Sequence, residues 1–377
     1  MAQVGTVTST GITPLTMKIT GAVGETYLVI ATVQVNEPTA TGAITCELVD
    51  NIDQNHIDQK EVFYPVSTAD FYSVTLCGSY TIDSTPGGLD LYLNITCASN
   101  VTAKEGQLIA IRTDGDDFYT TGINGGSTAS SSFSPIVTLG PFTVPSTANY
   151  WIVATGGLFK DTTASNCALQ LDIDGTGYRV MDTRMQNSTS PAVQPWAVSM
   201  QASLAAGSHT ITIDARSTTS GTAGVYYSNI FVIYIPTFLG SFYGEETSGK
   251  TTTSASYQDE LTSTHTATAS SYLMIGNSFV SFDTTGGSVA TNFLTGATEI
   301  SESHYTPTVA GAQSMFFGMK KITPGAGLLT QKTQFKRFSG GITRVASIID
   351  SSILWLELSP DAVVNVQGAV IKGATIW

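Results

Sequence analysis

The stretch of sequence that decides the fold is Asn149-Tyr150-Trp151-Ile152-Val153-Ala154-Thr155-Gly156, a short apolar run that begins at a tyrosine and ends at a glycine. The pattern recurs around Tyr27 and around Tyr272. In the 377-residue chain, Tyr27 and Tyr150 lie 123 residues apart, and Tyr150 and Tyr272 lie 122 apart. Because the interval is too long for a solenoid repeat, it predicts three copies of one small domain.

A second apolar segment keeps step with the first. It follows each tyrosine by about 80 residues, at 107–112, 229–235 and 352–358. The fixed separation predicts that the tyrosine segment and this later segment are neighbouring central strands of one sheet.

Each copy contains about eight short segments rich in β-branched and aromatic residues, and no window keeps a helical period for three turns. The sequence therefore predicts an all-β fold of three tandem antiparallel β-sandwich domains plus a short C-terminal strand. The predicted domains are residues 1–120, 121–239 and 240–360, followed by a strand and tail at 361–377. The predicted linkers are Asp114–Ser132 and Thr237–Thr253.

Turns containing glycine separate three pairs of later strands. They predict hairpins that join 71–82 to 89–97, 197–204 to 209–215, and 315–322 to 328–335. With the tyrosine strand and the late aliphatic strand side by side, this strand order resembles the jelly-roll domains of the tumour-necrosis-factor and complement-C1q type.

The composition argues against several classes of partner. Charged residues make up 12% of the chain and the net charge is −13, with 4 Lys and Arg against 14 Asp and Glu in residues 1–120. Nucleic-acid binding requires a basic footprint, so we expect none. No signal peptide and no apolar run long enough to cross a bilayer is visible, so we expect a chain folded in a cytoplasm, with no membrane partner.

Neither metal, cofactor nor disulfide is expected. The four cysteines (Cys46, Cys77, Cys97 and Cys167) form no C-x-x-C pair, and the histidines show no metal-ligand spacing. The acidic stretches 50–53 and 114–117 could offer oxygen ligands to Ca²⁺, but their spacing is not that of an EF-hand, and solvated loop acids are the preferred interpretation.

Three motifs are typical of catalytic sites, but the sequence around each lacks the structural elements that the chemistry requires, so we predict no catalytic residues. Residues 244–251 match G-x-x-x-x-G-K-[ST], but poor helix formers follow, and the segment is interpreted as a linker. Residues 172–176 match the D-x-D-G-T of aspartate-nucleophile phosphatases, but Asp-Gly in a β protein is first a turn. His209 could join a Ser and an Asp in a triad, a proposal of almost no specificity.

Six of the sixteen basic residues lie between Lys320 and Arg344. They could form a strip that contacts the acidic first domain of a neighbouring chain. A solvated, scattered face is the preferred interpretation.

Tandem β-sandwiches rich in Thr, Ser and Gly, with few charges, resemble surface proteins of tailed-bacteriophage particles. The resemblance implies a non-enzymatic virion protein, a head decoration or head fibre protein or a tail fibre, that forms a homotrimer and binds other virion proteins. It also implies host glycan or receptor contacts, for which loops 51–59, 185–195 and 299–313 are candidates. The alternatives are a polysaccharide-binding or polysaccharide-degrading tailspike, whose catalysis would need two carboxylates in a groove, and a bacterial surface adhesin.

Overall fold

The computed structural model describes residues 6–7, 12–19, 21–36, 43–50, 56–63, 71–82, 89–97, 101–113, 118–162, 166–184, 192–307, 310–341, 343–358 and 365–368. Within these ranges every regular element is a β-strand, apart from one 3-10 turn, η2 (Ile235–Thr237). The fold is all-β, as predicted, and its strands form six antiparallel sheets.

The first two sheets form what we call the first unit. One sheet has the order β1-β8-β3-β6, with strands β1 (Thr6–Val7), β8 (Val101–Thr113), β3 (Thr26–Asn36) and β6 (Tyr72–Thr81). The other has the order β2-β7-β4-β5, with strands β2 (Ile12–Ile19), β7 (Leu89–Cys97), β4 (Ile44–Asp50) and β5 (His56–Phe63). Their facing side chains make one apolar core.

The second unit repeats this order. Its sheets are β9-β16-β11-β14, with strands β9 (Phe118–Thr128), β16 (Ala223–Tyr234), β11 (Ala148–Lys160) and β14 (Ala192–Leu204), and β10-β15-β12-β13, with strands β10 (Ser134–Val144), β15 (Gly207–Ser217), β12 (Asn166–Ile173) and β13 (Thr176–Arg184).

The third unit repeats it again. Its first sheet is β17-β25-β20-β23, where β18 (Lys250–Thr252) extends the edge on β25, with strands β17 (Gly240–Glu246), β25 (Ala346–Leu358), β20 (Ser271–Phe282) and β23 (Gln313–Ile322). Its second sheet is β19-β24-β21-β22, with strands β19 (Gln258–Ala267), β24 (Gly327–Ser339), β21 (Ser288–Thr295) and β22 (Thr298–Tyr305). Two antiparallel sheets of four or five strands, connected in this order, make each unit a jelly-roll sandwich.

The tyrosine repeat marks equivalent strands. Tyr27, Tyr150 and Tyr272 lie on β3, β11 and β20, which occupy the same place in the three units. Each of these strands pairs with the predicted late strand, since β3 pairs with β8, β11 with β16 and β20 with β25. The predicted pairing of tyrosine and late strands is confirmed, whereas the boundaries at 120, 239 and 360 stay predictions.

The three predicted hairpins are wrong. In each unit the two strands of the expected pair lie in different sheets, because β6, β14 and β23 pair with the tyrosine strands while β7, β15 and β24 belong to the opposite sheet. The turn sequences reverse the chain direction in either arrangement. Burial of both strands' apolar faces in the sandwich then decides which sheet each one joins.

The two predicted linkers also contain strands. β9 lies within Asp114–Ser132 and pairs along β16, while β17 and β18 lie within Thr237–Thr253 and pair with β25. Gly122 and Gly125 explain why a glycine-rich segment pairs so closely, since an added Cβ would lie 1.8 Å from Asn229 and 3.2 Å from Tyr226. The composition that indicated a linker instead suits an edge strand beside large side chains.

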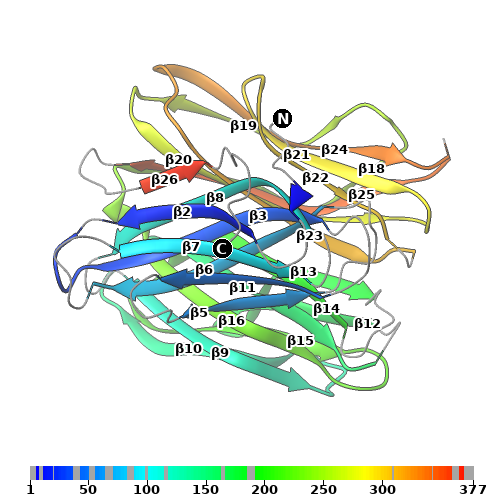
Figure 1. Ribbon diagram of the computed structural model, residues 1–377, viewed down its shortest axis with the longest axis horizontal. Coiled ribbons are helices and arrows are strands. Elements are labelled where there is room, and N and C mark those ends of the chain that lie inside the picture. The colour runs from blue at the N-terminus through cyan, green and yellow to red at the C-terminus, as the bar shows by residue number, and fades with distance from the viewer. Residues whose placement is uncertain are drawn as a thin grey trace.

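The three units form a ring. We call the sheets that contain β3, β11 and β20 the inner sheets, because side chains of all three share one apolar cluster, among them Ile30, Ile152 and Ile275. β6 contacts β14, β14 contacts β23, and β23 contacts β6. In Figure 1 the first unit (blue) lies between the third (yellow and orange, top) and the second (green, bottom).

Contacts between units follow one cyclic rule. β5 and β6 of the first unit pack on β11, β14 and β16 of the second, while β13 and β14 pack on β20, β23 and β25 of the third. β22 and β23 of the third unit pack in turn on β6 of the first. Such head-to-tail contacts close a ring when the rotation is right, and here the ring closes within one chain.

At these contacts between units, which we call seams, side chains donate hydrogen bonds to the open edges of the inner sheets. β6, β14 and β23 are edge strands, whose outward carbonyls would otherwise be buried without partners. Each seam supplies donors: Asn229 Nδ2 lies 3.3 Å from Cys77 O, Asn277 Nδ2 lies 3.2 Å from Ala197 O, Ser352 Oγ lies 3.0 Å from Ser199 O, and Ser73 Oγ lies 2.9 Å from Phe317 O.

The C-terminal strand returns to the first unit. β26 (Asn365–Gly368) pairs with β8 over residues 107–110, while β1 pairs with β8 over 101–102. In the second and third units the same edge is occupied by β9 and by β17 with β18. Both ends of the chain therefore contribute to one edge of the first inner sheet (Figure 1).

Substitution of Gly276 tests how closely the side chains pack in the third unit. A Cβ at this residue of β20 would lie 2.6 Å from the ring of Phe293, which stacks on Phe316 with ring centroids 4.8 Å apart. We expect Gly276→Val to lower the free energy of unfolding by about 1–3 kcal/mol, the usual cost of overpacking. Chemical denaturation measures it, with Gly325→Val as control because a Cβ at Gly325 meets nothing within 4 Å. Equal losses in the two variants would contradict the close packing.

Candidate functional site between the second and third units

A cleft opens where the second unit meets the third. It has a volume of about 350 Å³ and is lined by residues of β13, of β17 and the turn that follows β17, and of β25. The lining residues are Gly177, Tyr178, Arg179, Val180, Glu245, Thr247, Ile349 and Asp350. Polar groups from three strands thus converge on one hollow at a junction between units, a common place for a binding site.

A bulge in β13 directs Arg179 into the cleft. The pairing of β12 with β13 slips between Leu169 and Leu171, so that Arg179 and Val180 share the space opposite one residue. Arg179 has a φ of 51°, in the left-handed region that residues other than glycine rarely adopt. Bulges of this kind redirect a side chain, and this one turns the guanidinium toward the third unit.

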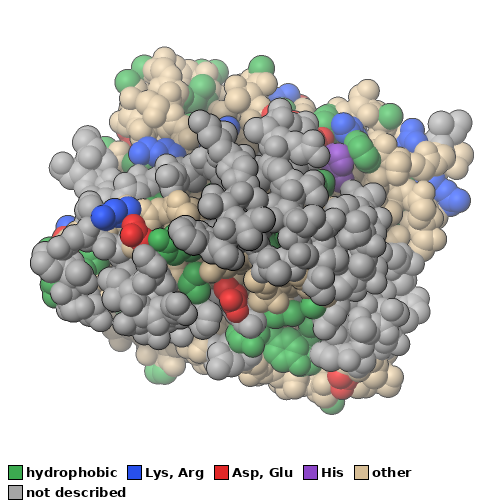
Figure 2. Space-filling model, viewed as in Figure 1, with side chains coloured by type: hydrophobic (Ala, Val, Ile, Leu, Met, Phe, Trp, Pro, Cys, Tyr) green, Lys and Arg blue, Asp and Glu red, His purple; other side chains and the backbone are tan. Residues whose placement is uncertain are grey.

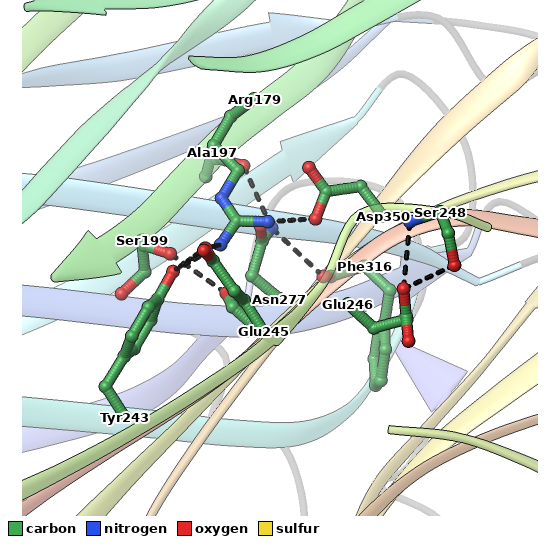
Figure 3. Close-up of polar contacts among 11 residues, drawn as sticks. Arg179, Ala197, Ser199, Tyr243, Glu245, Glu246, Ser248, Asn277, Phe316 and Asp350 are labelled. Carbon is green, nitrogen blue, oxygen red and sulfur yellow. Dashed lines mark hydrogen bonds and ion pairs between the residues drawn. The ribbon is translucent and has the colours of Figure 1, made fainter. Parts of the chain in front are cut away.

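Arg179 is bonded on both sides by the third unit. Its side chain is 2% exposed; Nη1 bonds Asp350 Oδ1, and Nη2 bonds the Tyr243 hydroxyl and Glu245 Oε2, the last at 2.7 Å. Tyr243 OH also donates to Glu245 Oε2, at 2.8 Å. Figure 3 shows the guanidinium between Asp350 on one side and Tyr243 with Glu245 on the other.

Burial and charge act in opposite directions on these groups. Burial raises the pKa of Asp350 to about 6, although Arg179 acts to lower it. Burial by itself would lower the pKa of Arg179, but Tyr243, Asp350 and Glu245 raise it above its ordinary value. Arg179 and Asp350 form a buried ion pair.

A second carboxylate is buried beside this cluster. Glu260 of β19 is 3% exposed, and neither of its carboxylate oxygens has a hydrogen-bond partner in the described chain. Burial raises the pKa of Glu260 to about 7, against the effect of Lys250, whose Nζ is 3.7 Å from Glu260 Oε2.

The G-x-x-x-x-G-K-[ST] match lies in the same region and does not form a phosphate loop. Its residues 244–251 run from the end of β17 into β18, which both pair with β25, and no helix begins there. A phosphate loop needs a helix N-terminus beyond the glycines. Glu245 lies against Arg179, and Glu246 Oε1 accepts hydrogen bonds from Ser248 (Figure 3).

The D-x-D-G-T match and His209 meet at the turn between β12 and β13. His209 Nδ1 lies 2.6 Å from Asp174 Oδ2, and Nε2 lies 2.7 Å from the Ala205 carbonyl. Because a carbonyl can only accept, the nitrogen that would serve as base in a triad carries a proton and is occupied. Asp172 accepts the Gly175 N–H at 2.7 Å, as expected of a turn.

The His209–Asp174 pair predicts a dependence of stability on pH. Burial lowers the pKa of His209, but the Ala205 carbonyl and Asp174 outweigh it and raise the pKa above 6.5. The pair's stabilisation is therefore complete below pH 6.5 and lost as pH rises through the folded-state pKa. We expect His209→Gln to lower the free energy of unfolding by less than about 1 kcal/mol near pH 6 and by a smaller amount near pH 9, and thermal unfolding at the two pH values measures both losses. A loss of stability that grows with pH would contradict the pairing.

The remaining candidates are the proposed Ca²⁺ stretches, the cysteines and the loops proposed for receptor contact. Residues 51–53 and 114–117 of the proposed Ca²⁺ stretches lie outside the described residues, and within the described ranges no three acidic, His or Cys side chains gather as a metal site. The four cysteines form no disulfide. Of the loops proposed for receptor contact, 56–59, 192–195 and 299–305 are parts of strands β5, β14 and β22, which corrects their assignment as loops. Residues 51–55, 185–191 and 308–309 lie outside the described residues, and the receptor contact stays a prediction.

Much of the basic strip is already paired within the third unit. Lys332 Nζ lies 2.5 Å from Asp259, Lys336 Nζ lies 3.9 Å from Glu302, and Arg337 Nε donates to the Thr253 carbonyl at 2.9 Å. In Figure 2 the described basic and acidic side chains are scattered over the visible face. A contact between this strip and a neighbouring chain stays a prediction.

None of the helical structure in the described ranges is long and apolar enough to span a bilayer.

Comparisons with known proteins show no family. No family model and no curated protein matches the sequence. Solved structures that it resembles include PNGF-II (TM-score 0.30, 10% identity, 89% of this chain and 98% of that one) and Sulfolobus turreted icosahedral virus (0.21, 10%, 97% and 90%). The infectious bursal disease virus VP2 subviral particle gives 0.20, at 10% identity over 95% and 82%. Likeness at this level carries no argument about function.

Proposed function

We propose that the chain is a non-enzymatic structural protein on the exterior of a bacteriophage particle, either a head decoration or fibre protein or a tail component. The ring of three jelly rolls carries this proposal. Each unit uses the face of its inner sheet and an edge strand to bind the next unit, so the fold is organised around contact between jelly-roll units. Few charged residues, 12% of the chain, leave a neutral polar exterior suited to further packing.

Labelling of purified virions tests the proposed location. Gold-conjugated antibodies against the chain, viewed by electron microscopy, are expected to decorate heads or tails at regular positions. Mass spectrometry of the same virions should find the chain at a fixed copy number. Its absence from particles, with abundance in infected-cell lysate, would refute the proposal.

Homotrimer formation belongs to the same proposal. The inner sheets are buried within one chain, so three copies would have to meet through the outer sheets, such as β2-β7-β4-β5, or through loops. Light scattering after size-exclusion chromatography should then give three times the chain mass of 39.6 kDa. A monomer would remove the trimer from the proposal and leave the particle location standing.

Polysaccharide degradation is the alternative, because Glu245 and Asp350 bring two carboxylates into one cleft. A glycosidase of this type needs one carboxyl group protonated as the acid. Arg179 bonds one oxygen of each carboxylate, and burial raises the pKa of Asp350 to about 6 against the effect of Arg179. Incubation with host capsular polysaccharide and an assay for new reducing ends separates the two functions, and turnover that Asp350→Asn abolishes would establish the alternative.

A further inference from the structure

The cleft between the second and third units has hydrogen-bond acceptors that the protein does not use. Arg179 and Tyr243 bond Glu245 through Oε2, and Arg179 bonds Asp350 through Oδ1. Within the described chain, Glu245 Oε1 and Asp350 Oδ2 accept no hydrogen bond from protein. Both residues line the cleft, where the side chain of Glu245 is 49% exposed.

Apolar side chains stand beside these acceptors. Tyr178 and Val180 flank Arg179 in the β13 bulge, and both line the cleft while remaining 40% and 38% exposed. They belong to a small group of large hydrophobic side chains left exposed in the described chain. The bulge thus turns the cation inward and leaves an aromatic and an aliphatic side chain at the mouth.

The chemistry of the cleft selects among ligands. Its two carboxylates outnumber its single guanidinium, which is already bonded on both sides, so phosphates and other anions are disfavoured. The free oxygens need donors, and the tyrosine ring offers an apolar surface with a polar tip. A sugar ring presents both hydroxyl donors and a face of C–H groups. A volume near 350 Å³ lies at the lower end for small-molecule sites, about 300–1,000 Å³.

We propose that this cleft binds a neutral saccharide of one or two sugar units, with the C–H face on Tyr178 and hydroxyls donating to Glu245 Oε1 and Asp350 Oδ2. Arg179 is a positioning residue, since its bonds hold both carboxylates with one oxygen turned to the ligand. The site deepens the proposed contact with a host surface by naming the ligand class. Binding by the purified chain does not depend on its place in a particle, so the two proposals can fail separately.

Saturation-transfer NMR on the full chain tests the site, with the methyl glycosides of glucose, galactose, mannose and N-acetylglucosamine as probes. We expect at least one to bind the wild type with a Kd of about 1–10 mM, and Tyr178→Ala to weaken binding about fivefold or more. Tyr178→Phe should stay within about twofold, because it keeps the ring. Phe338→Ala is the matched control, since Phe338 is 51% exposed but does not line the cleft.

Three results would overturn the proposal. The first is that none of the four glycosides shows saturation transfer at about ten times the expected Kd, and the second is that Tyr178→Ala binds the sugar with unchanged affinity. The third is that cadaverine at equal concentration displaces the sugar, which would mark the cleft as an amine site. Glu245→Gln gives a second reading if Tyr178→Ala fails to fold. It keeps the shape of the side chain, and the affinity should fall because an amide accepts more weakly than a carboxylate.

Discussion

Replacing Arg179 with alanine is expected to lower the free energy of unfolding by about 3–5 kcal/mol, the cost of removing one partner from a buried ion pair. The substitution leaves Asp350, whose side chain is 11% exposed, without its counter-ion, and removes a bonding partner from Tyr243 and Glu245. It also breaks both ion pairs that join the second and third units in the described chain. Urea unfolding followed by tryptophan fluorescence measures the loss.

Two further variants separate the buried pair from a general charge effect. Arg216→Ala is the matched control, because Arg216 pairs with Asp182 at 29% and 43% side-chain exposure and should contribute below about 1 kcal/mol. The double variant Arg179→Met with Asp350→Leu removes both charges and should recover much of the loss. If Arg179→Ala costs no more than Arg216→Ala, the seam does not depend on the pair.

Trp151→Ala is expected to lower the free energy of unfolding by about 3–5 kcal/mol, as is usual when a fully buried tryptophan is truncated. Trp151 is 0% exposed on β11, in the apolar cluster that all three units share, and its Nε1 donates to Ser199 Oγ at 2.9 Å. Because this cluster continues across the seams, thermal unfolding should show one early transition for the whole ring. Calorimetry measures both the midpoint and the number of transitions.

Trp151→Phe is the control for this prediction. It keeps an aromatic ring but loses the hydrogen bond to Ser199, so it should lower the free energy of unfolding by about 1–2 kcal/mol. If Trp151→Ala is no less stable than Trp151→Phe, the surrounding side chains must collapse into the space that the tryptophan leaves. A separate early transition confined to one unit would show that the units do not share a core.

The repeat could be found from sequence because it is local and periodic. An apolar run headed by Tyr27, Tyr150 or Tyr272 is a central strand in each unit, buried on both faces, and such strands are the most strongly patterned. The late apolar segments are central for the same reason. The fixed separation of the two segments was enough to predict their pairing.

Edge strands and the cleft lacked such a signal. β9 and β17 are rich in Gly, Thr or Ser, and only their pairing with β16 and β25 makes them strands. The bulge at Arg179 leaves no mark in the sequence, and its partner Asp350 is 171 residues away. The sole local hint was Asp174-Gly175, which correctly indicated the turn that begins β13.

The position of β26 beside β8 has a consequence for synthesis on the ribosome. Part of the inner-sheet edge of the first unit is made of residues 365–368, which are translated after the strands of all three units. Until then, the backbone donors and acceptors of β8 at 107–110 have no strand on that side. This edge of the first unit is therefore completed only after the other two units have been made, and a stop codon before residue 365 would leave β8 without this neighbouring strand.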